Sequence, residues 1–358
     1  MNEVEGKDMC NIAAYAGNRQ AAPILLEMLR RQQDYDGGMS AGIATVHEGK
    51  LYWRKVVGSV ETLMQETDAL SLPGTIGIAH TRPAGTEQTY HYAHPHISMD
   101  GETAVVLNGT APLDQYAAQR ADVIRMLDEN GYLFKTALEG SSNGWPVLKN
   151  GKYVIGSAET RVHLVDYYLK QGKSCSEAMA LTAADLYSDN VFLMINAKVS
   201  DRLFALRTTR PMNILMGEGE CYLATARVGF PEEISGEIMS LPLHHACEIT
   251  RGGLTVTGYG AAVETVCEPT PYTYAEGYRR ICELLRGKKD APLYFDDLEI
   301  AVKRDMRDLW PEEHTYVQDA RLVYDIIDQL QAEGKLRSEV RPQQCKSGVR
   351  NRVFMWLD

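Results

Sequence analysis

Cys10 is the residue of this sequence best suited to act as a nucleophile, and it stands at the head of the run 11–15. A cysteine thiolate attacks carbonyl carbon and forms a thioester, and we find no other nucleophilic route in the sequence. A cysteine in such a run is more often a buried free thiol that only packs. Cys10 alone therefore leaves both roles open, and the residues that follow must decide between them.

Four more short motifs follow Cys10 within about a hundred residues, and they supply imidazoles, a guanidinium and a side-chain amide. Arg82 follows the apolar run 75–80, and Asn108 follows the apolar run 104–107, where a strand end can hold a side chain in place. The motifs lie at 40–44, 78–82, 93–96 and 108–109. Each alone would carry little weight, but five in one order and at fitting spacing make chance agreement improbable.

This order of motifs resembles the glutaminase domain of class II glutamine amidotransferases, which are N-terminal-nucleophile hydrolases. It is similar in particular to the glutaminase half of glucosamine-6-phosphate synthases. The resemblance, assigned to residues 10–262, implies an α+β fold, namely a four-layer αββα sandwich. It also implies an amidohydrolase that releases ammonia from glutamine, or from a related amide, through a thioester on Cys10. It implies no cofactor.

The resemblance assigns a catalytic role to each matching residue. Cys10 becomes the first residue of the mature chain, and its own α-amine, which titrates near pH ~8, serves as the general base. Asn108 and Gly109 donate a side-chain amide and a backbone N–H to the oxyanion, and such a donor contributes about 3 kcal/mol. Arg82 holds the substrate carboxylate, because a guanidinium fork fits a carboxylate better than an ammonium does.

A free amine on Cys10 requires that residues 1–9, MNEVEGKDM, be absent from the mature chain. We expect one of two routes. Either cleavage removes this stretch as a leader, or translation begins at Met9 and the methionine is then trimmed.

Three positions on the substrate side, Gly37, His94 and Ser157, complete the predicted site. His94 has a structural, hydrogen-bonded role as its alternative. Ser157 stands where the family has the aspartate that binds the α-ammonium of glutamine, and losing that bond costs about 1.5–3 kcal/mol. A different γ-glutamyl-type amide is therefore the alternative substrate. The pattern also departs from the family at Asn11, at the extra residue before Ser40, at Pro83 and at Gly85.

Histidines near the site raise a metal centre as a competing interpretation. His91, His94 and His96 lie close together in the sequence, but no carboxylate or cysteine completes a tetrahedral set. A second group, formed by His244, His245 and Cys247, is weaker. The family resemblance explains the first group, so we expect no metal.

The composition of the chain is that of a folded globular protein. Hydrophobic residues make up 44% and charged residues 24%, and the net charge of −11 disfavours a whole-chain role in coating nucleic acid. No apolar run is long enough to span a membrane, and residues 1–9 lack the apolar stretch of a secretory signal. Seven scattered cysteines fit reduced thiols. We therefore expect a cytoplasmic protein.

Hydrophobic periodicity predicts alternating helices and strands over the first 257 residues. Helices are expected at 20–34, 113–127, 159–170 and 176–187. Strands are expected at 43–46, 51–57, 75–80, 104–107, 191–196, 202–207, 213–216, 221–224 and 246–257.

A second unit is expected after the stretch 263–273, where Pro269 and Pro271 interrupt the pattern. Helices at 274–285, 295–307 and 319–333, then strands at 336–340 and 352–357, resemble a winged helix over residues 274–358. The last strands carry six basic residues, namely Lys335, Arg337, Arg341, Lys346, Arg350 and Arg352. They leave nucleic-acid binding open, but the acidic chain favours a solvated hairpin.

The chain shows no motif of a synthase domain, so we expect ammonia to go to a separate synthase subunit or to be released. A third interpretation belongs to another class of function. It is a degenerate domain that binds a glutamine-like ligand and regulates through its C-terminal unit. A homo-oligomer remains open in each case.

Overall fold

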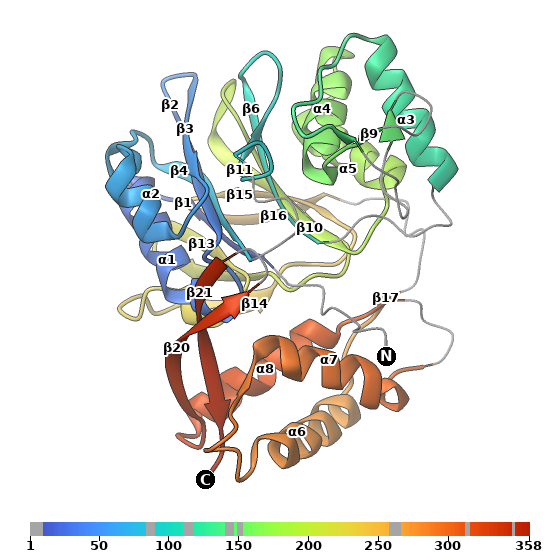
Figure 1. The fold of residues 1–358 in the computed structure, drawn as a ribbon. Coiled ribbons are helices and arrows are strands. Elements are labelled where there is room, and N and C mark those ends of the chain that lie inside the picture. The colour runs from blue at the N-terminus through green and yellow to red at the C-terminus, as the bar shows by residue number, and fades with distance from the viewer. Residues whose placement is uncertain are drawn as a thin grey trace.

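The computed structural model describes residues 10–83, 90–109, 117–139, 147–148, 153–257, 266–311, 316–345 and 348–358. Two large sheets lie face to face, with helices on their outer faces, and a smaller helical unit lies below them in Figure 1. Of the predicted residues, the stretch 1–9, Gly85 and Lys346 lie outside the described part, as do parts of the expected helix at 113–127 and of the boundary at 263–273.

The first sheet has seven strands in the order β14-β12-β13-β1-β4-β2-β3. The pairings between them, including those that flank the central strand β1, are antiparallel. Its strands are β1 (Asn11–Ala16), β2 (Ser40–His47), β3 (Lys50–Val56), β4 (Ile76–Arg82), β12 (Asn213–Gly217), β13 (Glu220–Ala224) and β14 (Glu237–Ser240).

The second sheet has six strands in the order β16-β15-β11-β10-β6-β5. Its strands are β5 (His96–Ile97), β6 (Thr103–Gly109), β10 (Asn190–Asn196), β11 (Val199–Arg207), β15 (Ala246–Thr250) and β16 (Gly253–Thr257). A small separate sheet joins β7 (Leu138–Glu139), β9 (Tyr153–Val154) and β8 (Val147–Leu148).

Strand β1 shows why the fold has four layers. Successive side chains of a strand point to opposite faces, and in β1 both faces are buried. Ile12 and Ala14 join an apolar cluster with residues of the second sheet, whereas Ala13 and Tyr15 pack with the helices on the other face. A strand buried on both faces must lie between two layers, as β1 does here.

The helices form the two outer layers. α1 (Ala21–Asp36) and α2 (Val60–Glu66) pack on the first sheet. α4 (Ser157–Lys170) and α5 (Cys175–Asp185) pack on the second sheet, and α3 (Ala117–Glu129) lies against α4. Short 3-10 helices lie at Ala69–Ser71, Arg227–Gly229 and Arg307–Leu309. The predicted αββα sandwich is therefore confirmed.

We call the elements from α6 to β21 the C-terminal module, and its three helices pack with β18 and β21 in one apolar core. Its elements are α6 (Pro271–Leu285), β18 (Leu293–Tyr294), α7 (Phe295–Asp305), α8 (Asp319–Ala332), β20 (Arg337–Cys345) and β21 (Gly348–Trp356). β18, β21 and β20 form a sheet in that order, and β17 (Val266–Cys267) pairs with β19 (Tyr316–Val317). Tyr35 of α1 belongs to the same core, so the module packs directly on the sandwich.

Several predicted bounds were wrong. The single strand expected at 246–257 is a hairpin that turns at Arg251 and Gly252. Pro271 does not interrupt structure but begins α6, since proline suits the first turn of a helix. The expected polar loop between the last two strands is part of one long hairpin, β20–β21.

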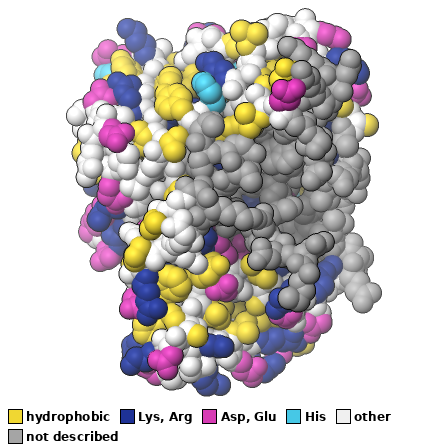
Figure 2. Space-filling model, in the orientation of Figure 1, with side chains coloured by type: hydrophobic (Ala, Val, Ile, Leu, Met, Phe, Trp, Pro, Cys, Tyr) yellow, Lys and Arg dark blue, Asp and Glu magenta, His cyan; other side chains and the backbone are white. Residues whose placement is uncertain are grey.

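Each basic residue of that hairpin that the structure describes lies beside a carboxylate. Arg350 and Arg352 are buried, and both lie beside Asp296. Arg337 and Arg341 pair with Asp358 and Glu339. On the face shown in Figure 2, basic and acidic side chains are interspersed over the lower part of the molecule. Among the helices of the described part, none has the length and apolar character that crossing a bilayer requires.

Candidate active site

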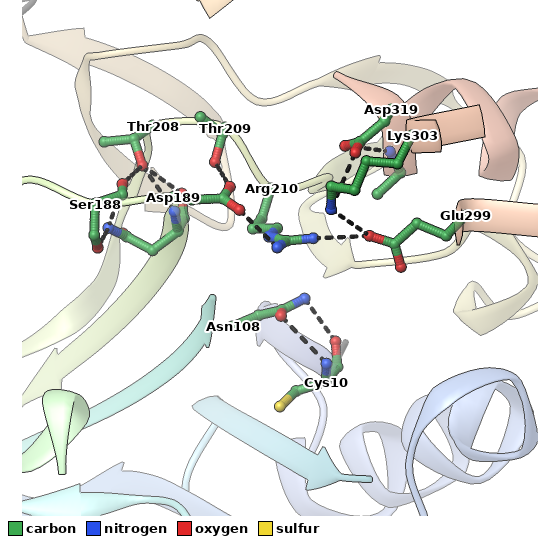
Figure 3. Close-up of polar contacts among 12 residues, drawn as sticks. Cys10, Asn108, Ser188, Asp189, Thr208, Thr209, Arg210, Glu299, Lys303 and Asp319 are labelled. Atoms are coloured by element: carbon green, nitrogen blue, oxygen red, sulfur yellow. Dashed lines mark hydrogen bonds and ion pairs between the residues drawn. The ribbon is translucent and has the colours of Figure 1, made fainter. Parts of the chain in front are cut away.

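Cys10 and Asn108 are joined by two reciprocal hydrogen bonds (Figure 3). The Cys10 backbone N–H donates to Asn108 Oδ1 over 3.2 Å, and Asn108 Nδ2 donates to the Cys10 carbonyl oxygen over 2.6 Å. Cys10 directly precedes β1 in the first sheet, and Asn108 is near the end of β6 in the second. The sandwich thus brings together two residues that are 98 positions apart in the chain.

Gly109 is a position at which only glycine fits. Its φ of 148° lies in the region that other residues rarely adopt. A Cβ added there would lie 2.2 Å from the Asp189 carbonyl oxygen and 2.6 Å from Asn190 Cα. Gly109 pairs with Asn190 of β10, so the backbone after Asn108 is pressed against the start of that strand.

Arg82 lies at the same end of the first sheet as Cys10. Asn11 pairs with Thr81 across β1 and β4, so the next residues outward, Cys10 and Arg82, are neighbours in this pairing. The Arg82 guanidinium lies over the ring of Tyr92, 5.5 Å from its centre. Arg82 is partly exposed, as a residue that receives a substrate carboxylate must be.

Ser157 begins α4 and is buried, with its hydroxyl bonded to the Arg161 guanidinium. Arg161 is also fully buried and donates to the Leu186 carbonyl oxygen and to Ser188 Oγ, over 2.7 and 2.6 Å. Among the described residues no carboxylate pairs with Arg161. Burial, with the charge of Arg120 nearby, lowers the pKa of Arg161 to about 9.

Ser188 connects Ser157 and Arg161 to the strand ends near Gly109. Asn190 Nδ2 donates to Ser188 Oγ over 2.7 Å, and Asn190 stands opposite Gly109. Where the family pattern has an aspartate, this chain therefore has the Ser157 hydroxyl, with the buried Arg161 guanidinium bonded to it. That arrangement is unfavourable to the ammonium of an α-amino acid.

Gly37 marks the end of α1 and is tightly packed. A Cβ there would lie 2.7 Å from Thr81 Cγ2, and the next residue, Gly38, donates its N–H to Thr81 Oγ1 over 2.8 Å. The Gly37 carbonyl oxygen accepts a hydrogen bond from Arg350 over 3.1 Å. This contact comes from β21, so the C-terminal module reaches the predicted substrate side.

His94 is buried, and its Nδ1 accepts a hydrogen bond from the Leu107 backbone N–H over 3.1 Å. Its ring stacks on that of His80, with 3.9 Å between their centres, and meets the edge of His96. Burial lowers the pKa of all three imidazoles, to about 3 for His80. The structure thus supports the structural alternative for His94.

The contacts of Asn11 could not be predicted from the sequence. Asn11, which departs from the family pattern, is buried and donates to the carbonyl oxygens of Gln32 and Asp36 over 2.9 and 2.7 Å. Its own side-chain oxygen accepts from Tyr324 of α8 over 3.4 Å. A contact across 313 residues has no local signal in a single sequence.

Comparison with known proteins bears on these assignments. No protein-family model matches the chain. The glutamine–fructose-6-phosphate aminotransferase (isomerizing) of Pyrococcus horikoshii is 30% identical over 219 residues, which are 61% of this chain and 32% of that protein. The same-named protein of Shewanella oneidensis is 30% identical over 271 residues, 75% of this chain and 40% of its own length. The chain thus spans well under half of these relatives.

Solved structures show the fold. A glutamine phosphoribosylpyrophosphate amidotransferase from B. subtilis, complexed with ADP and GMP, superimposes with a TM-score of 0.57 at 16% identity, over 96% of this chain and 71% of the other. A structure described as the allosteric regulatory enzyme of purine biosynthesis gives 0.58 at the same identity and coverage. The predicted resemblance is confirmed: in sequence this chain is similar to the glutaminase domain of glutamine–fructose-6-phosphate aminotransferases, and in fold it is similar to glutamine amidotransferases.

Proposed function

We propose that this chain is a glutamine amidotransferase-type amidohydrolase with Cys10 as its nucleophile. The observation that carries the proposal is the reciprocal pair between Cys10 and Asn108. It holds the backbone of a thiol-bearing residue against a side-chain amide, beside a glycine whose backbone no other residue could adopt. This is the arrangement that nucleophilic attack on an amide needs.

In the proposed reaction the Cys10 thiolate forms a C–S bond to the amide carbon, and the C–N bond breaks as ammonia leaves with a proton. Water then hydrolyses the thioester, which returns the thiol and releases the acid. Asn108 Nδ2 donates one of its two hydrogens to the Cys10 carbonyl oxygen. We assign its second hydrogen, together with the Gly109 backbone N–H, to the oxyanion.

The general base in this proposal is a free α-amine on Cys10. In the chain described here that nitrogen is a peptide N–H, which carries no basic lone pair, and it donates to Asn108 Oδ1. Once the preceding residues are removed, the amine can keep the same partner. Asn108 would then orient the base as well as the oxyanion.

The substrate is proposed to be an amide whose carboxylate meets Arg82. Ser157 and the buried Arg161 disfavour an ammonium on the amine side, so a γ-glutamyl-type amide without a free α-ammonium is the second candidate. The ammonia acceptor would lie on another chain or on a part of the protein outside these residues.

For the C-terminal module we propose a winged-helix-like arrangement that holds residues next to the site in place. Its sequence of elements, with β18 beside β21, is the one that a winged helix requires. Tyr324 and Arg350 reach Asn11 and Gly37, which suits a supporting role. Burial of Arg350 and Arg352 removes them from any nucleic-acid surface.

The test is kinetic and uses the full chain released so that it begins at Cys10. Ammonia production from L-glutamine and from γ-glutamyl amides is measured for the wild type, Cys10→Ala and Cys267→Ala. We expect Cys10→Ala to lose at least about a thousandfold in kcat, and Cys267→Ala to match the wild type. Equal activity in Cys10→Ala would overturn the proposal.

A further inference from the structure

Leu107 directly precedes Asn108, and the two peptide groups that flank it are each held by an imidazole. His80 Nε2 lies 3.1 Å from the Leu107 carbonyl oxygen, and the Leu107 N–H donates to His94 Nδ1 over 3.1 Å. His80 belongs to β4 of the first sheet, whereas Leu107 belongs to β6 of the second. The contact therefore crosses the interior of the sandwich, just before the residue that holds Cys10.

The end of a strand pairing explains why these imidazoles are needed. β5 pairs with β6 only at Val105 and Ala104. The N–H and C=O of Leu107 lie beyond that pairing, and a buried backbone group left without a partner costs about 1–3 kcal/mol. His80 and His94 supply the hydrogen-bond partners that the strand pairing does not. Their rings stack with 3.9 Å between their centres, which fixes one ring against the other.

The hydrogen bonds also fix both tautomers. A carbonyl oxygen only accepts, so His80 must carry its proton on Nε2, and an N–H only donates, so His94 Nδ1 must be unprotonated. His80 is fully buried, and its Nδ1 has no partner among the described residues. Burial lowers the pKa of both imidazoles, so both stay neutral and the arrangement persists at neutral pH.

We propose that His80 and His94 are positioning residues for amide hydrolysis: by holding the backbone N–H and C=O of Leu107 they set the side chain of Asn108 against Cys10 and the oxyanion. This inference rests on the proposed function. It assigns His94 to the support of the oxyanion donors, and it adds His80, to which the motif comparison gave no role.

Two pairs of isosteric variants test the clamp. A glutamine side chain can present its amide near the Nε2 position of a histidine, and an asparagine near the Nδ1 position. His80→Gln and His94→Asn therefore keep the needed donor and acceptor, whereas His80→Asn and His94→Gln lose them. The four variants have the same polarity, and His47→Gln, at an exposed position, serves as the outside control.

We expect His80→Asn and His94→Gln to lower kcat at least about tenfold with KM within about twofold, because oxyanion donors act mainly in the transition state. His80→Gln and His94→Asn should recover most of that loss. Thermal unfolding of all four variants identifies any that fail to fold. Equal kcat within each pair, among folded variants, overturns the proposal.

A second readout does not depend on activity. Hydrogen exchange at the Leu107 amide should be at least about tenfold faster in His94→Gln than in His94→Asn. A wild type without Cys10-dependent activity would defeat the proposed function, and the exchange comparison would then decide alone whether His94 holds the Leu107 N–H. Equal exchange in the two variants contradicts the clamp.

Discussion

At the scale of single residues, the site is defined by close approaches that leave little freedom. Gly109 is the sharpest case. Gly109→Ala should destabilise the protein by about 2 kcal/mol or more and abolish amidase activity, because the new Cβ would lie 2.2 Å from the Asp189 carbonyl oxygen.

The matched control for that change is Gly131→Ala. Gly131 also has a positive φ, of 82°, but a Cβ there meets nothing within 4 Å. Gly131→Ala should lower the free energy of unfolding only by the backbone strain, about 1 kcal/mol, and should leave activity intact. Chemical denaturation of both variants makes the comparison, and equal losses would show that crowding at Gly109 is unimportant.

A second prediction at this scale concerns Ser157. In Ser157→Asp the new carboxylate would meet the Arg161 guanidinium, which has no anionic partner among the described residues. We expect higher thermal stability but only a small gain in L-glutamine affinity, less than about tenfold. The reason is that Arg161 would neutralise the new carboxylate, which then attracts the substrate ammonium less strongly. Adding Arg161→Gln should release the carboxylate and improve binding further.

Calorimetry on the single and double variants measures these affinities, with Ser157→Asn as the uncharged control. If Ser157→Asn binds glutamine as well as either aspartate variant, charge at this position does not select the substrate.

At the scale of secondary structure elements, β4 and β5 bury His80, His94 and His96 in neutral form, beside the cations Arg82 and Lys55. Their pKa values lie below those of the unfolded chain, so the unfolded state binds more protons in acid. Stability is therefore complete above about pH 6.5 and falls as the pH drops, by about 1.4 kcal/mol per pH unit for each histidine.

Urea unfolding of the wild type and His80→Gln between pH 4 and 8 measures this effect. The difference between their unfolding free energies should be constant above about pH 6.5 and should shift in favour of the variant below it. A difference that does not change with pH would mean that His80 is not held neutral.

The elements also show what a sequence can predict. Long periodic stretches such as α1 and the β2–β3 hairpin were placed within a few residues. α2 was missed because seven residues are too few for a helical period to emerge, and β14 was missed because its Ile238 and Met239 are partly exposed at a sheet edge. The sequence motifs pointed to Cys10, Arg82 and Asn108, and the structure places each of them beside or at the end of a strand.

The rest of the site depends on long-range packing that no local pattern records. Arg161 beneath Ser157 and His80 beneath Leu107 became visible only from the contacts. The expectation of a solvated hairpin was wrong at Arg350 and Arg352 for the same reason. Arg350 lies beside Asp36 of α1 and Arg352 lies beside Asp296, and both are buried.

At the scale of the whole molecule, a buried ion network joins the sandwich to the C-terminal module (Figure 3). Arg210 lies 2.6 Å from Asp189, which lies beside Gly109, and 3.2 Å from Glu299 of α7. Lys303 adds contacts to Glu299 and Asp319. The second unit expected over residues 274–358 is therefore joined to the sandwich by polar contacts whose charged groups require their partners.

This network predicts a pH effect of the opposite sign. Burial, with Asp319 nearby, raises the pKa of Glu299 to about 7 although Arg210 opposes the shift. The folded state then binds more protons than the unfolded state between about pH 4.5 and 7, so stability falls as the pH rises through that range. Glu299→Gln removes this loss and still accepts a hydrogen bond from Arg210.

Thermal unfolding of Glu299→Gln and the wild type at pH 5 and pH 8 provides the test. The variant should gain relative to the wild type at pH 8, by about 1.4 kcal/mol for each pH unit in which the wild type loses stability. Lys303→Gln removes the neighbouring cation instead, which should raise the pKa of Glu299 further and lower stability at pH 8 relative to the wild type. No difference between the two pH values would contradict the account of this interface.

The most direct test of the central claim is the mass analysis of an active preparation after reaction with a glutamine-analogue diazoketone. Peptide mapping then reports both the first residue of the reacted chain and the position of the adduct. We predict a chain that begins at Cys10 and carries one adduct on its sulfur. An active chain that retains residues 1–9, or an adduct on any other cysteine, would contradict the mechanism.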